Sequence, residues 1–305
     1  IRILHVFMGM GRSGVPVMLM NYFRHIDRTK VIFDFAVEDE DCQTFDEEIE
    51  ILGGKVHRLG VNSSEPGFYT RLGKVIRNGK YDIVHSHMGN RNIPILLWAL
   101  FSGAKIRVSH SHNTFKTNHF LFRHMNRIVR GLNNAIPTHR FACSVAAGES
   151  MFGNVAYEKG KVLVINNAIE IDEFLYDPGT GKAVRRELGL GEGFVLGSVG
   201  NFTPLKNYSF MIDVMHELVR IVPSVKLVVA GGGSLMEDIR NKIFEYNLGD
   251  NIMLLGRRSD VSRLYNAFDL LLLTSFYEGL SIALIEAQAS GLRCLASSSI
   301  TQESN

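Results

Sequence analysis

The stretch that decides the fold is LLLTSFYEGLSIALIEAQAS, residues 271–290. It opens on an apolar run that ends at Thr274, turns at Glu278-Gly279 and continues with apolar residues at helical spacing. This pattern predicts a buried strand that leads through a short turn into a helix, which is half of a unit of a parallel α/β sheet. Ligands of such sheets bind at the carboxyl ends of the strands, so we expect a binding site at this turn.

Two carboxylates mark the predicted turn, Glu278 at its start and Glu286 further along the helix. The amides at the helix start belong to Gly279, Leu280, Ser281 and Ile282. Unpaired amides and the positive end of a helix dipole suit a phosphate, and carboxylates beside them suit sugar hydroxyls. The alternative is that Glu278 only caps the helix and that Glu286 is solvated. The stretch as a whole predicts a site for a phosphorylated sugar.

The composition is that of an ordinary globular protein with room for two domains. The 305 residues are 46% apolar and 21% charged, with a formal net charge of +2, which demands no nucleic acid or other special partner. The longest apolar runs, such as Ile95–Phe101, are too short to span a bilayer, and no cationic-apolar leader is visible. Three scattered cysteines argue against a disulfide framework or a zinc site. We therefore expect a cytoplasmic protein.

Apolar and amphipathic segments alternate along the chain, which predicts parallel sheets with helices on both faces. The first series runs from a strand at 1–7 to one at 162–165, and the second from 194–200 to 293–296. A turn cluster at 177–181 separates them. We predict an α/β fold of two tandem doubly wound, Rossmann-like domains, residues 1–170 and 171–305, with a ligand cleft between them. Because the sequence stops directly after a strand, we expect the second domain to be incomplete.

The first strand is followed by Gly9, Gly11 and Gly14 in the spacing G-x-G-x-x-G, and the second ends near Glu38-Asp39. This is formally the dinucleotide fingerprint, with an acid where a ribose would lie, so an NAD(P)-dependent oxidoreductase is a real alternative. Against it, the third glycine lacks its usual small neighbours, and the other polar motifs lie in the second domain. The plain alternative is a turn that needs positive φ.

No metal site is expected from the sequence. Asp39-Glu40-Asp41 matches the Asp-x-Asp pattern with which some sugar transferases hold a divalent ion, but adjacent acids in a loop are usually solvated. His87, His110 and His112 lie near predicted strand ends, with no spacing that recruits acids as co-ligands. A lone histidine is usually a satisfied polar residue. Of the three, we expect His112 to lie in the cleft.

Further polar residues follow the first two strands of the second domain. Lys206 lies where a strand meets a helix, and there a lysine and the helix dipole can neutralise a diphosphate. The next strand ends in Gly231-Gly232-Gly233, whose backbone can approach a ligand closely. The alternatives are a surface lysine and a plain turn. Their position at strand ends favours a site for the lysine.

The stretch from Ile83 to Gly148 contains no Asp or Glu, but eight Lys or Arg and seven His. Its central helix, predicted over 119–132, carries arginines at near-helical spacing between apolar residues. Such a basic region, here 105–140, suits an anionic membrane surface or a diphosphate-linked acceptor. The alternative for the helix alone is a core helix with one basic, solvated face.

With these residues placed, the chain resembles glycosyltransferase family 4, the retaining nucleotide-sugar transferases of GT-B fold, and among them the bacterial exopolysaccharide and capsule enzymes. The resemblance covers nearly the whole chain. Its most specific part, Tyr277–Ala287, matches the family's Glu-x7-Glu signature. Residues 199–207 match the donor-phosphate loop, and His110–Asn113 match the motif whose second histidine lies near the donor sugar. Asn201 and Ser281 depart from the family, which commonly has Arg and Pro there.

The resemblance implies a role for each matched residue. Lys206 would neutralise the donor diphosphate, Glu278 would hold hydroxyls of the transferred sugar, and His112 would face that sugar. Glu286 would hold the ribose hydroxyls, and Gly14 would let the first domain close on the phosphate. The other donor-binding positions would be Gly200, Asn201, Gly232, Gly279, Leu280, Ser281 and Ile282.

The resemblance therefore implies a retaining hexosyltransferase that uses a nucleotide sugar, for which we expect a UDP-sugar, and no metal or other cofactor. The acceptor would be a saccharide or a lipid-linked saccharide of cell-surface polysaccharide synthesis, bound by the first domain. The basic region would contact the inner face of the plasma membrane. Two alternatives stay open: an NAD(P)-dependent oxidoreductase, and a non-catalytic sugar-phosphate-binding protein.

Overall fold

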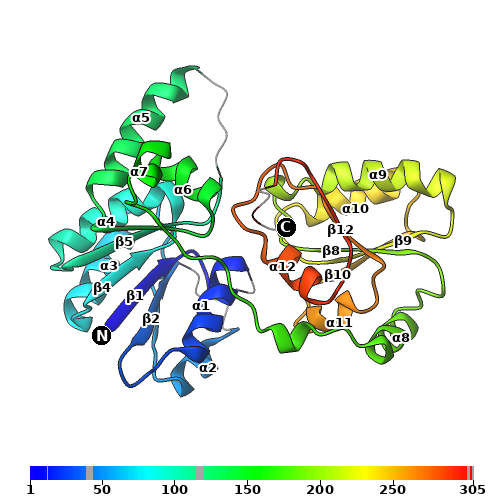
Figure 1. Ribbon diagram of the computed structural model, residues 1–305, viewed down its shortest axis with the longest axis horizontal. Coiled ribbons are helices and arrows are strands. Elements are labelled where there is room, and N and C mark those ends of the chain that lie inside the picture. The colour runs from blue at the N-terminus through cyan, green and yellow to red at the C-terminus, as the bar shows by residue number, and fades with distance from the viewer. Residues whose placement is uncertain (12, 39–43, 115–119, 301–302, 304–305) are drawn as a thin grey trace. The chain divides into compact units, whose positions relative to one another are not determined.

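The computed structural model describes residues 1–11, 13–38, 44–114, 120–300 and 303, with backbone alone for 120–126. The acidic run Asp39-Glu40-Asp41 lies outside these residues. The chain divides into two compact units, Ile1–Ala168 (unit 1) and Ile169–Asn305 (unit 2), and each has its own sheet (Figure 1). The sequence predicted a boundary near residue 170.

Unit 1 is built on a seven-stranded sheet of order β3-β2-β1-β4-β5-β6-β7, in which every described pairing is parallel. Its elements are β1 (Arg2–Phe7), α1 (Gly14–His25), β2 (Ile32–Val37), α2 (Asp46–Ile51), β3 (Val56–Arg58), α3 (Pro66–Gly79), β4 (Ile83–Ser86), η1 (Gly89–Arg91), α4 (Asn92–Phe101), β5 (Ile106–Ser111), α5 (Phe120–Ala135), β6 (His139–Ala142), α6 (Val145–Phe152), α7 (Asn154–Glu158) and β7 (Leu163–Val164).

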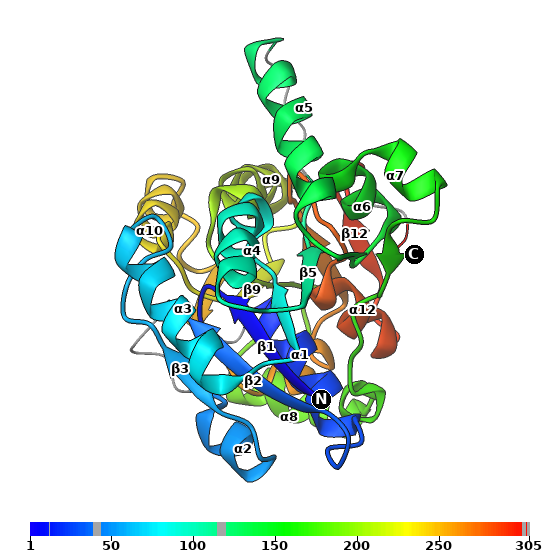
Figure 2. The same cartoon turned by 90° about the vertical axis from the view of Figure 1, so that its left-hand side faces the viewer.

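Both faces of the unit 1 sheet are covered by helices. On one face, α3 and α4 pack fully buried side chains such as Leu72 and Ile95 against Leu4 of β1. On the other, Phe23 of α1 stacks on Phe33 of β2, with ring centroids 5.2 Å apart. Figure 2 shows α5 extending beyond the rest of unit 1. The strands end between these layers, and their carboxyl ends carry the loops described below.

Unit 2 has a five-stranded parallel sheet of order β10-β9-β8-β11-β12 in the described chain. Its elements are η2 (Ile171–Phe174), α8 (Pro178–Glu187), β8 (Val195–Val199), η3 (Pro204–Lys206), α9 (Tyr208–Ile221), β9 (Lys226–Ala230), α10 (Met236–Glu245), β10 (Ile252–Gly256), α11 (Val261–Tyr265), β11 (Leu270–Leu273), α12 (Ile282–Ala289) and β12 (Cys294–Ala296).

The leucine run of β11 lies between two hydrophobic cores. Leu271 and Leu273 pack in one core with residues of α8, α11 and α12, whereas Leu272 packs in the other with residues of α9 and α10. Successive side chains of a strand point to opposite faces, so a strand buried on both faces is apolar at every position. This confirms the fold class expected for the stretch 271–290, a strand that leads into a helix of a parallel sheet.

Three helices, α6, α7 and α8, were not predicted. The cluster at 177–181 was expected to be a turn, but α8 begins there: the Asp177 side chain accepts hydrogen bonds from the amides of Gly179 (3.0 Å) and Thr180 (2.9 Å). An N-cap acid followed by proline is a strong helix start, and it outweighs the two glycines. Similarly, the Ser144 side chain caps α6 by accepting from the amide of Ala147.

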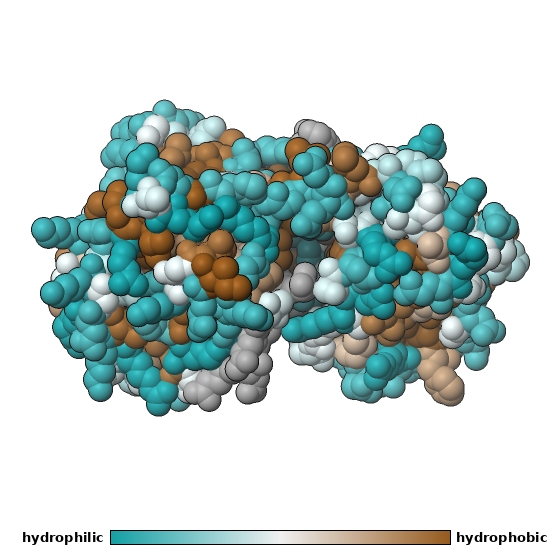
Figure 3. All heavy atoms as spheres, turned by 90° about the horizontal axis from the view of Figure 1, so that it is seen from below, coloured by the Kyte–Doolittle hydropathy of each residue, from teal (hydrophilic) through white to brown (hydrophobic). Residues whose placement is uncertain are grey.

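The surface in Figure 3 is mostly hydrophilic on both units, with apolar residues in scattered patches. In the part of the chain that the structure describes, no helix is long and apolar enough to span a bilayer.

Candidate active site

The strand order of unit 2 reverses between β8 and β11. The chain runs from β8 outward to β9 and β10, then returns to place β11 on the other side of β8. In doubly wound sheets the ligand binds at such a switch point, outside the carboxyl ends of the strands. Lys206 follows β8 and Glu278 follows β11, so the fold brings these two predicted residues to the same place.

Lys206 and Glu278 form an ion pair at this switch point. The Lys206 Nζ donates to Glu278 Oε1 at 2.6 Å, and the Ser275 hydroxyl donates to the same oxygen at 2.7 Å. The side chains of Lys206 and Glu278 are only 20% and 9% exposed. Lys206 is therefore not an ordinary surface lysine, because its ammonium group is held in place by a buried carboxylate.

The loops that carry this pair are fixed to each other. The Thr274 hydroxyl lies 3.1 Å from the carbonyl oxygens of both Lys206 and Asn207. The Phe276 amide donates to the Leu205 carbonyl at 2.9 Å. These contacts connect the segment after β8 to the segment after β11, so the position of the ammonium group is set by backbone as well as by the ion pair.

The start of α12 lacks the cap that its sequence offers. Ser281 is the N-cap residue in an extended conformation, yet its side chain makes no cap hydrogen bond. Its hydroxyl is buried and has no partner among the residues that the structure describes. A serine at this position normally accepts from an amide of the first helical turn. The Ser281 hydroxyl is thus a buried donor with no described acceptor at the start of this helix.

Glu286 lies within α12 and contacts a different side chain. The Tyr265 hydroxyl donates to Glu286 Oε2 at 2.9 Å. Burial raises the pKa of Glu286 to about 7, and the hydrogen bond from Tyr265 opposes that rise. The carboxylate is partly buried, so it is not the solvated residue of the alternative hypothesis. Its described contacts are with Tyr265, and not with Lys206 or Glu278.

The glycine run after β9 serves the protein's own backbone. A Cβ on Gly231 would lie 1.9 Å from the Gly200 carbonyl oxygen, and one on Gly233 would lie 2.5 Å from that of Phe202. A Cβ on Gly232 would meet the Arg257 side chain at 3.3 Å. At Gly231 and Gly233 the close approach is to the loop that carries Lys206, and the expected contact of Gly232 with the donor stays a prediction.

Asn201 and Gly14, which were also predicted to bind the donor, lie near strand ends of their sheets. Asn201 is half-buried after β8, and its carbonyl accepts from the Thr203 amide at 2.9 Å. Gly14 is exposed and begins α1, at the carboxyl-end edge of the unit 1 sheet. Both positions follow the carboxyl end of a strand, β8 for Asn201 and β1 for Gly14.

Five histidines gather in unit 1, on the adjacent strands β1, β4 and β5 or just beyond their ends. They are His5, His85, His87, His110 and His112. His5 and His85 are partners in the sheet register. The pairs in β4 and β5 are each spaced by two residues and so project from the same face of the sheet. Sequence reasoning singled out three of them but missed the cluster.

The imidazoles of this cluster bond to one another. His87 connects His5 and His112: its Nε2 lies 3.0 Å from His5 Nδ1 and its Nδ1 lies 2.8 Å from His112 Nε2. His85 Nε2 lies 3.1 Å from His110 Nδ1. Burial lowers the pKa of all five, to about 3 for His5 and His112, so the cluster is neutral at pH 7.

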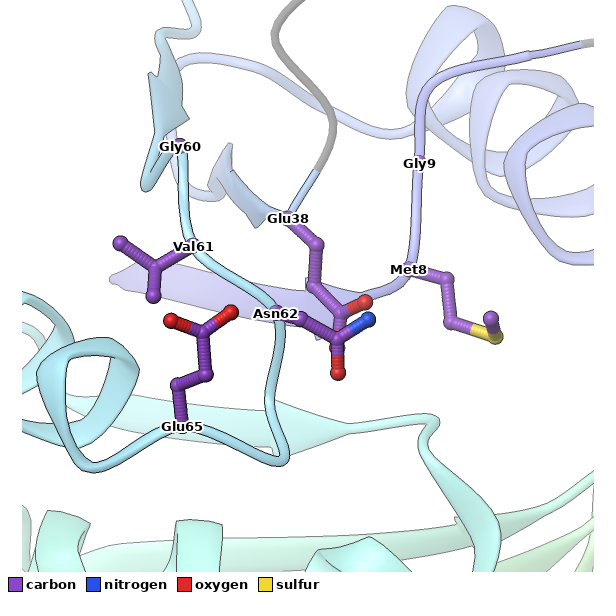
Figure 4. Close-up of a pocket in the computed structure, with 7 residues that line it drawn as sticks. All are labelled: Met8, Gly9, Glu38, Gly60, Val61, Asn62 and Glu65. Atoms are coloured by element: carbon purple, nitrogen blue, oxygen red, sulfur yellow. The ribbon is translucent and has the colours of Figure 1, made fainter.

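A cavity of about 510 Å³ lies at the carboxyl ends of β1, β2 and β3 of unit 1. Its lining residues are Met8, Gly9, Glu38, Gly60, Val61, Asn62 and Glu65 (Figure 4). Glu38 is held by the Ser63 amide at 2.9 Å and by Arg91, whose guanidinium lies 3.6 Å away. Carboxylates and an amide at a cavity wall suit hydroxyl groups, which both donate and accept. Sequence reasoning did not find this cavity, because its residues come from three separate loops.

Part of the basic region serves the structure of unit 1. Arg107 donates to the carbonyl oxygens of Ala104 (3.0 Å) and Ile136 (3.3 Å), and Arg130 donates to that of Ser150 (3.3 Å). On α5, however, Ile128 is 65% exposed. The helix therefore presents apolar as well as basic side chains to its surroundings.

The chain has relatives of known class. Residues 182–302 match the family model of glycosyl transferases group 1. The chain is 33% identical over 308 residues to the putative glycosyltransferase EpsF of Bacillus subtilis, which covers 99% of this chain and 80% of that protein. This chain belongs to the group 1 glycosyltransferases. The family assignment places the transferase hypothesis ahead of the oxidoreductase and the non-catalytic binding protein.

Other relatives agree with this assignment. A UDP-Gal:alpha-D-GlcNAc-diphosphoundecaprenol alpha-1,3-galactosyltransferase of Escherichia coli is 28% identical over 233 residues, 74% of this chain and 60% of that protein. Among solved structures, Anabaena Alr3699/HepE in complex with UDP-glucose has a TM-score of 0.79 at 19% identity, over 98% of this chain and 80% of that one. At that identity the likeness shows the fold, which is the expected GT-B arrangement of two Rossmann-like units.

Proposed function

We propose that this glycosyltransferase moves a hexosyl unit from a UDP-sugar to a saccharide or lipid-linked acceptor in the synthesis of cell-surface polysaccharide, with retention of the anomeric configuration. The observation that carries the proposal is the Lys206–Glu278 pair at the switch point of unit 2. The donor and acceptor named for the Escherichia coli relative, and the UDP-glucose in the HepE structure, support the choice of substrates.

The donor diphosphate would bind beside Lys206 and the start of α12. An ammonium group has three N–H donors, and Lys206 uses one on Glu278, so two can donate to phosphate oxygens. The Ser281 hydroxyl and the amides of α12 supply further donors. Cleavage of the glycosyl–phosphate bond builds negative charge on the leaving diphosphate, and fixed donors lower that barrier. Transfer then requires no metal ion.

The carboxylates would hold hydroxyl groups of the donor. Glu278 would accept from hydroxyls of the transferred sugar, since Lys206 and Ser275 fix its position. Glu286 would accept from the ribose through Oε1, because Oε2 already accepts from Tyr265. The roles implied by the family resemblance thus fit the surroundings of both residues.

Retention requires the acceptor to attack from the face that the diphosphate leaves. In that geometry the departing phosphate can take the proton of the acceptor hydroxyl, so no general base of the protein is needed. His112, neutral at pH 7, would then contact the transferred sugar as a hydrogen-bonding group rather than as a cation. Gly14, at the start of α1, would allow the backbone of unit 1 to approach the phosphate.

The cavity of unit 1 is our candidate for the acceptor saccharide. Glu38, Asn62 and Glu65 bring acceptor oxygens and an amide to its wall (Figure 4). These groups favour an acceptor that offers neutral hydroxyls at this point, because a carboxylate or phosphate there would face like charge.

We also propose that α5 contacts an anionic membrane surface, where a lipid-linked acceptor would be found. The helix extends beyond the rest of unit 1 in Figures 1 and 2, and Arg127 lies exposed beside the apolar Ile128 and Leu132. Basic and apolar side chains on one helix suit the boundary of anionic lipids. Sedimentation with vesicles should show binding to anionic but not to neutral lipids, and Ile128→Asp should reduce it.

A nucleotide-sugar panel tests the proposed function. A ligand bound only by the folded state raises the melting temperature, so UDP-sugars should stabilise the protein more than GDP-sugars or NAD(P)H. The stabilising sugar, incubated with an acceptor, should give a product of the same anomeric configuration by NMR. Stabilisation by NAD(P)H alone would favour the oxidoreductase, an inverted product would reject retention, and stable binding without any transfer would favour the binding protein.

A further inference from the structure

The histidine cluster of unit 1 contains more than the proposed transfer reaction uses. Only His112 has a role in that reaction, whereas His87 and His110 are buried beside it. One ligand nitrogen from each of these three side chains lies within 4.8 Å of the others. Three imidazoles that converge in this way are a ligand set for a transition metal ion.

The spacing of the nitrogens is close to what an ion needs. Zn–N distances of about 2.0–2.1 Å place tetrahedral ligand nitrogens roughly 3.4 Å apart. His87 Nδ1 and His112 Nε2 are now 2.8 Å apart and share a proton. An ion would replace that proton with small movements of the rings, because His112 lies just beyond the end of β5.

The second ring nitrogens of the cluster also favour an ion. His110 Nε2 is buried and has no hydrogen-bond partner among the described residues. Its other nitrogen, Nδ1, is held by His85, and the Nε2 of His87 is held by His5. Metal-ligating histidines are normally oriented by such a second contact.

A route of entry distinguishes this group from its neighbour. His5, His85 and His87 also converge within 4.8 Å, but all three are buried, whereas His112 is partly exposed. An ion can therefore reach His112 from solvent. The fourth position of the ion would face the same side and would take water or an anion.

We propose that His87, His110 and His112 bind one first-row transition metal ion, such as Zn²⁺. The set contains imidazoles alone, which suit Zn²⁺, Cu²⁺ and Ni²⁺ and not Mg²⁺ or Ca²⁺, whose ligands are oxygens. Because the ion takes a nitrogen of His112, we expect Zn²⁺ to inhibit transfer. That consequence rests on the proposed function, but binding itself does not.

Calorimetry tests the binding on the full chain, freed of any affinity tag and stripped of metal with a chelator. Zn²⁺ should bind one ion per chain, and Co²⁺ should give the visible absorption of a tetrahedral nitrogen site. His112→Asn and His110→Asn should each weaken Zn²⁺ binding by at least about tenfold. His216→Asn, a histidine of α9 in unit 2, is the matched control and should bind as the unchanged chain does.

The buried variant His110→Asn can disturb folding, which its circular dichroism spectrum would show. In that case the Zn²⁺ affinity of His112→Asn decides the test, because His112 is partly exposed and outside the core. Equal Zn²⁺ affinity in all four proteins, or no stoichiometric binding in the unchanged chain, would overturn the proposal. Zn²⁺ binding in a chain that transfers no sugar would leave the metal site standing and reject the proposed function. Sugar transfer by a chain that binds no Zn²⁺ would support the proposed function and reject the metal site.

Discussion

At the scale of single residues, the account depends on side chains that are held by the protein but still have capacity for a ligand. Glu286 shows this most clearly. One oxygen accepts from Tyr265, and burial raises the pKa of the carboxyl group to about 7. A buried carboxylate gains when a ligand supplies hydrogen-bond donors, because these favour the ionised form.

The pH dependence of UDP affinity tests the role of Glu286. If ribose hydroxyls donate to the ionised carboxylate, affinity should rise from pH 6 to pH 8 as the group titrates near pH 7, by up to about tenfold. The phosphate of UDP also titrates in this range and contributes to the pH dependence of the affinity. Glu286→Gln keeps that contribution and removes the one from Glu286, so it is the control. A slope that is the same in both proteins would contradict the assignment of Glu286 to the ribose.

The same carboxyl group makes a prediction for stability. Its folded pKa, about 7, lies above its ordinary value of 4.5, so folding favours the protonated form. The contribution of this group to the free energy of unfolding is fully present below pH 4.5 and is lost as pH rises through 7. Glu286→Gln should therefore flatten the decline of the free energy of unfolding between pH 5 and 8, measured by urea titration. An unchanged pH dependence would argue that the carboxyl group titrates normally.

The variant Ser281→Ala distinguishes a capping role of this serine from a role in ligand binding. Its hydroxyl makes no cap hydrogen bond, so Ser281→Ala should cost little stability, less than the roughly 1 kcal/mol usual for loss of an N-cap. If the hydroxyl donates to the diphosphate, UDP affinity should still fall, by about fivefold for one hydrogen bond of about 1 kcal/mol. A loss of stability with unchanged affinity would show that Ser281 is a structural cap.

At the scale of elements, the site is built from two loops that depend on close backbone contact. Gly231, after β9, lies so near the Gly200 carbonyl that a Cβ would come within 1.9 Å of it. Gly231→Ala must displace the loop that carries Lys206. We expect lower stability, by about 1–3 kcal/mol, together with weaker UDP binding.

Gly249→Ala is the matched control, because a Cβ there meets nothing within 4 Å. Urea unfolding and calorimetry with UDP measure the two effects. Equal behaviour of the two alanine variants would contradict the view that the glycine run supports the Lys206 loop.

The sequence predicted elements well where one local pattern decides them. The leucines of β11 and the apolar spacing of α12 gave a strand and a helix, because burial on both faces leaves no other pattern. It failed at α8, since proline and glycines indicate a turn unless Asp177 is recognised as the cap. Lys206 and Glu278 were predicted separately, and only the parallel order of β8 beside β11 places them in contact.

The histidine cluster could not be predicted from local sequence patterns either, because sheet order brings its members together. His5 lies 82 residues from its hydrogen-bond partner His87, and the contact arises from the pairing of β1 with β4. The spacing of the histidines along the chain does not predict this contact. Sites of this kind form only when the order of the strands in the sheet, which depends on long-range packing, brings their residues together.

At the scale of the whole molecule, each unit has its own hydrophobic core. The cores of unit 2 contain residues of unit 2 alone, and the described core of unit 1 contains residues of unit 1 alone. Units with separate cores can unfold in separate transitions. Most of the proposed donor contacts lie in unit 2, so UDP should raise the melting temperature of unit 2 more than that of unit 1.

Calorimetric scanning with one core variant in each unit tests this division. Leu72→Ala, in unit 1, should lower the melting temperature of the transition that UDP raises less, by a destabilisation of about 2–5 kcal/mol. Leu271→Ala, in unit 2, should lower the transition that UDP raises more. A UDP-sensitive transition lowered by Leu72→Ala alone would place the donor in unit 1.

The most direct test of the account is the UDP affinity and transfer rate of Lys206→Ala compared with Lys226→Ala. Lys226 begins β9, at the opposite end of the strands, so its removal takes away the same charge without touching the switch point. We predict that Lys206→Ala loses transfer and binds UDP at least about tenfold more weakly, and that Lys226→Ala retains both. Unchanged UDP affinity and transfer in Lys206→Ala would contradict the central claim that this lysine holds the donor diphosphate.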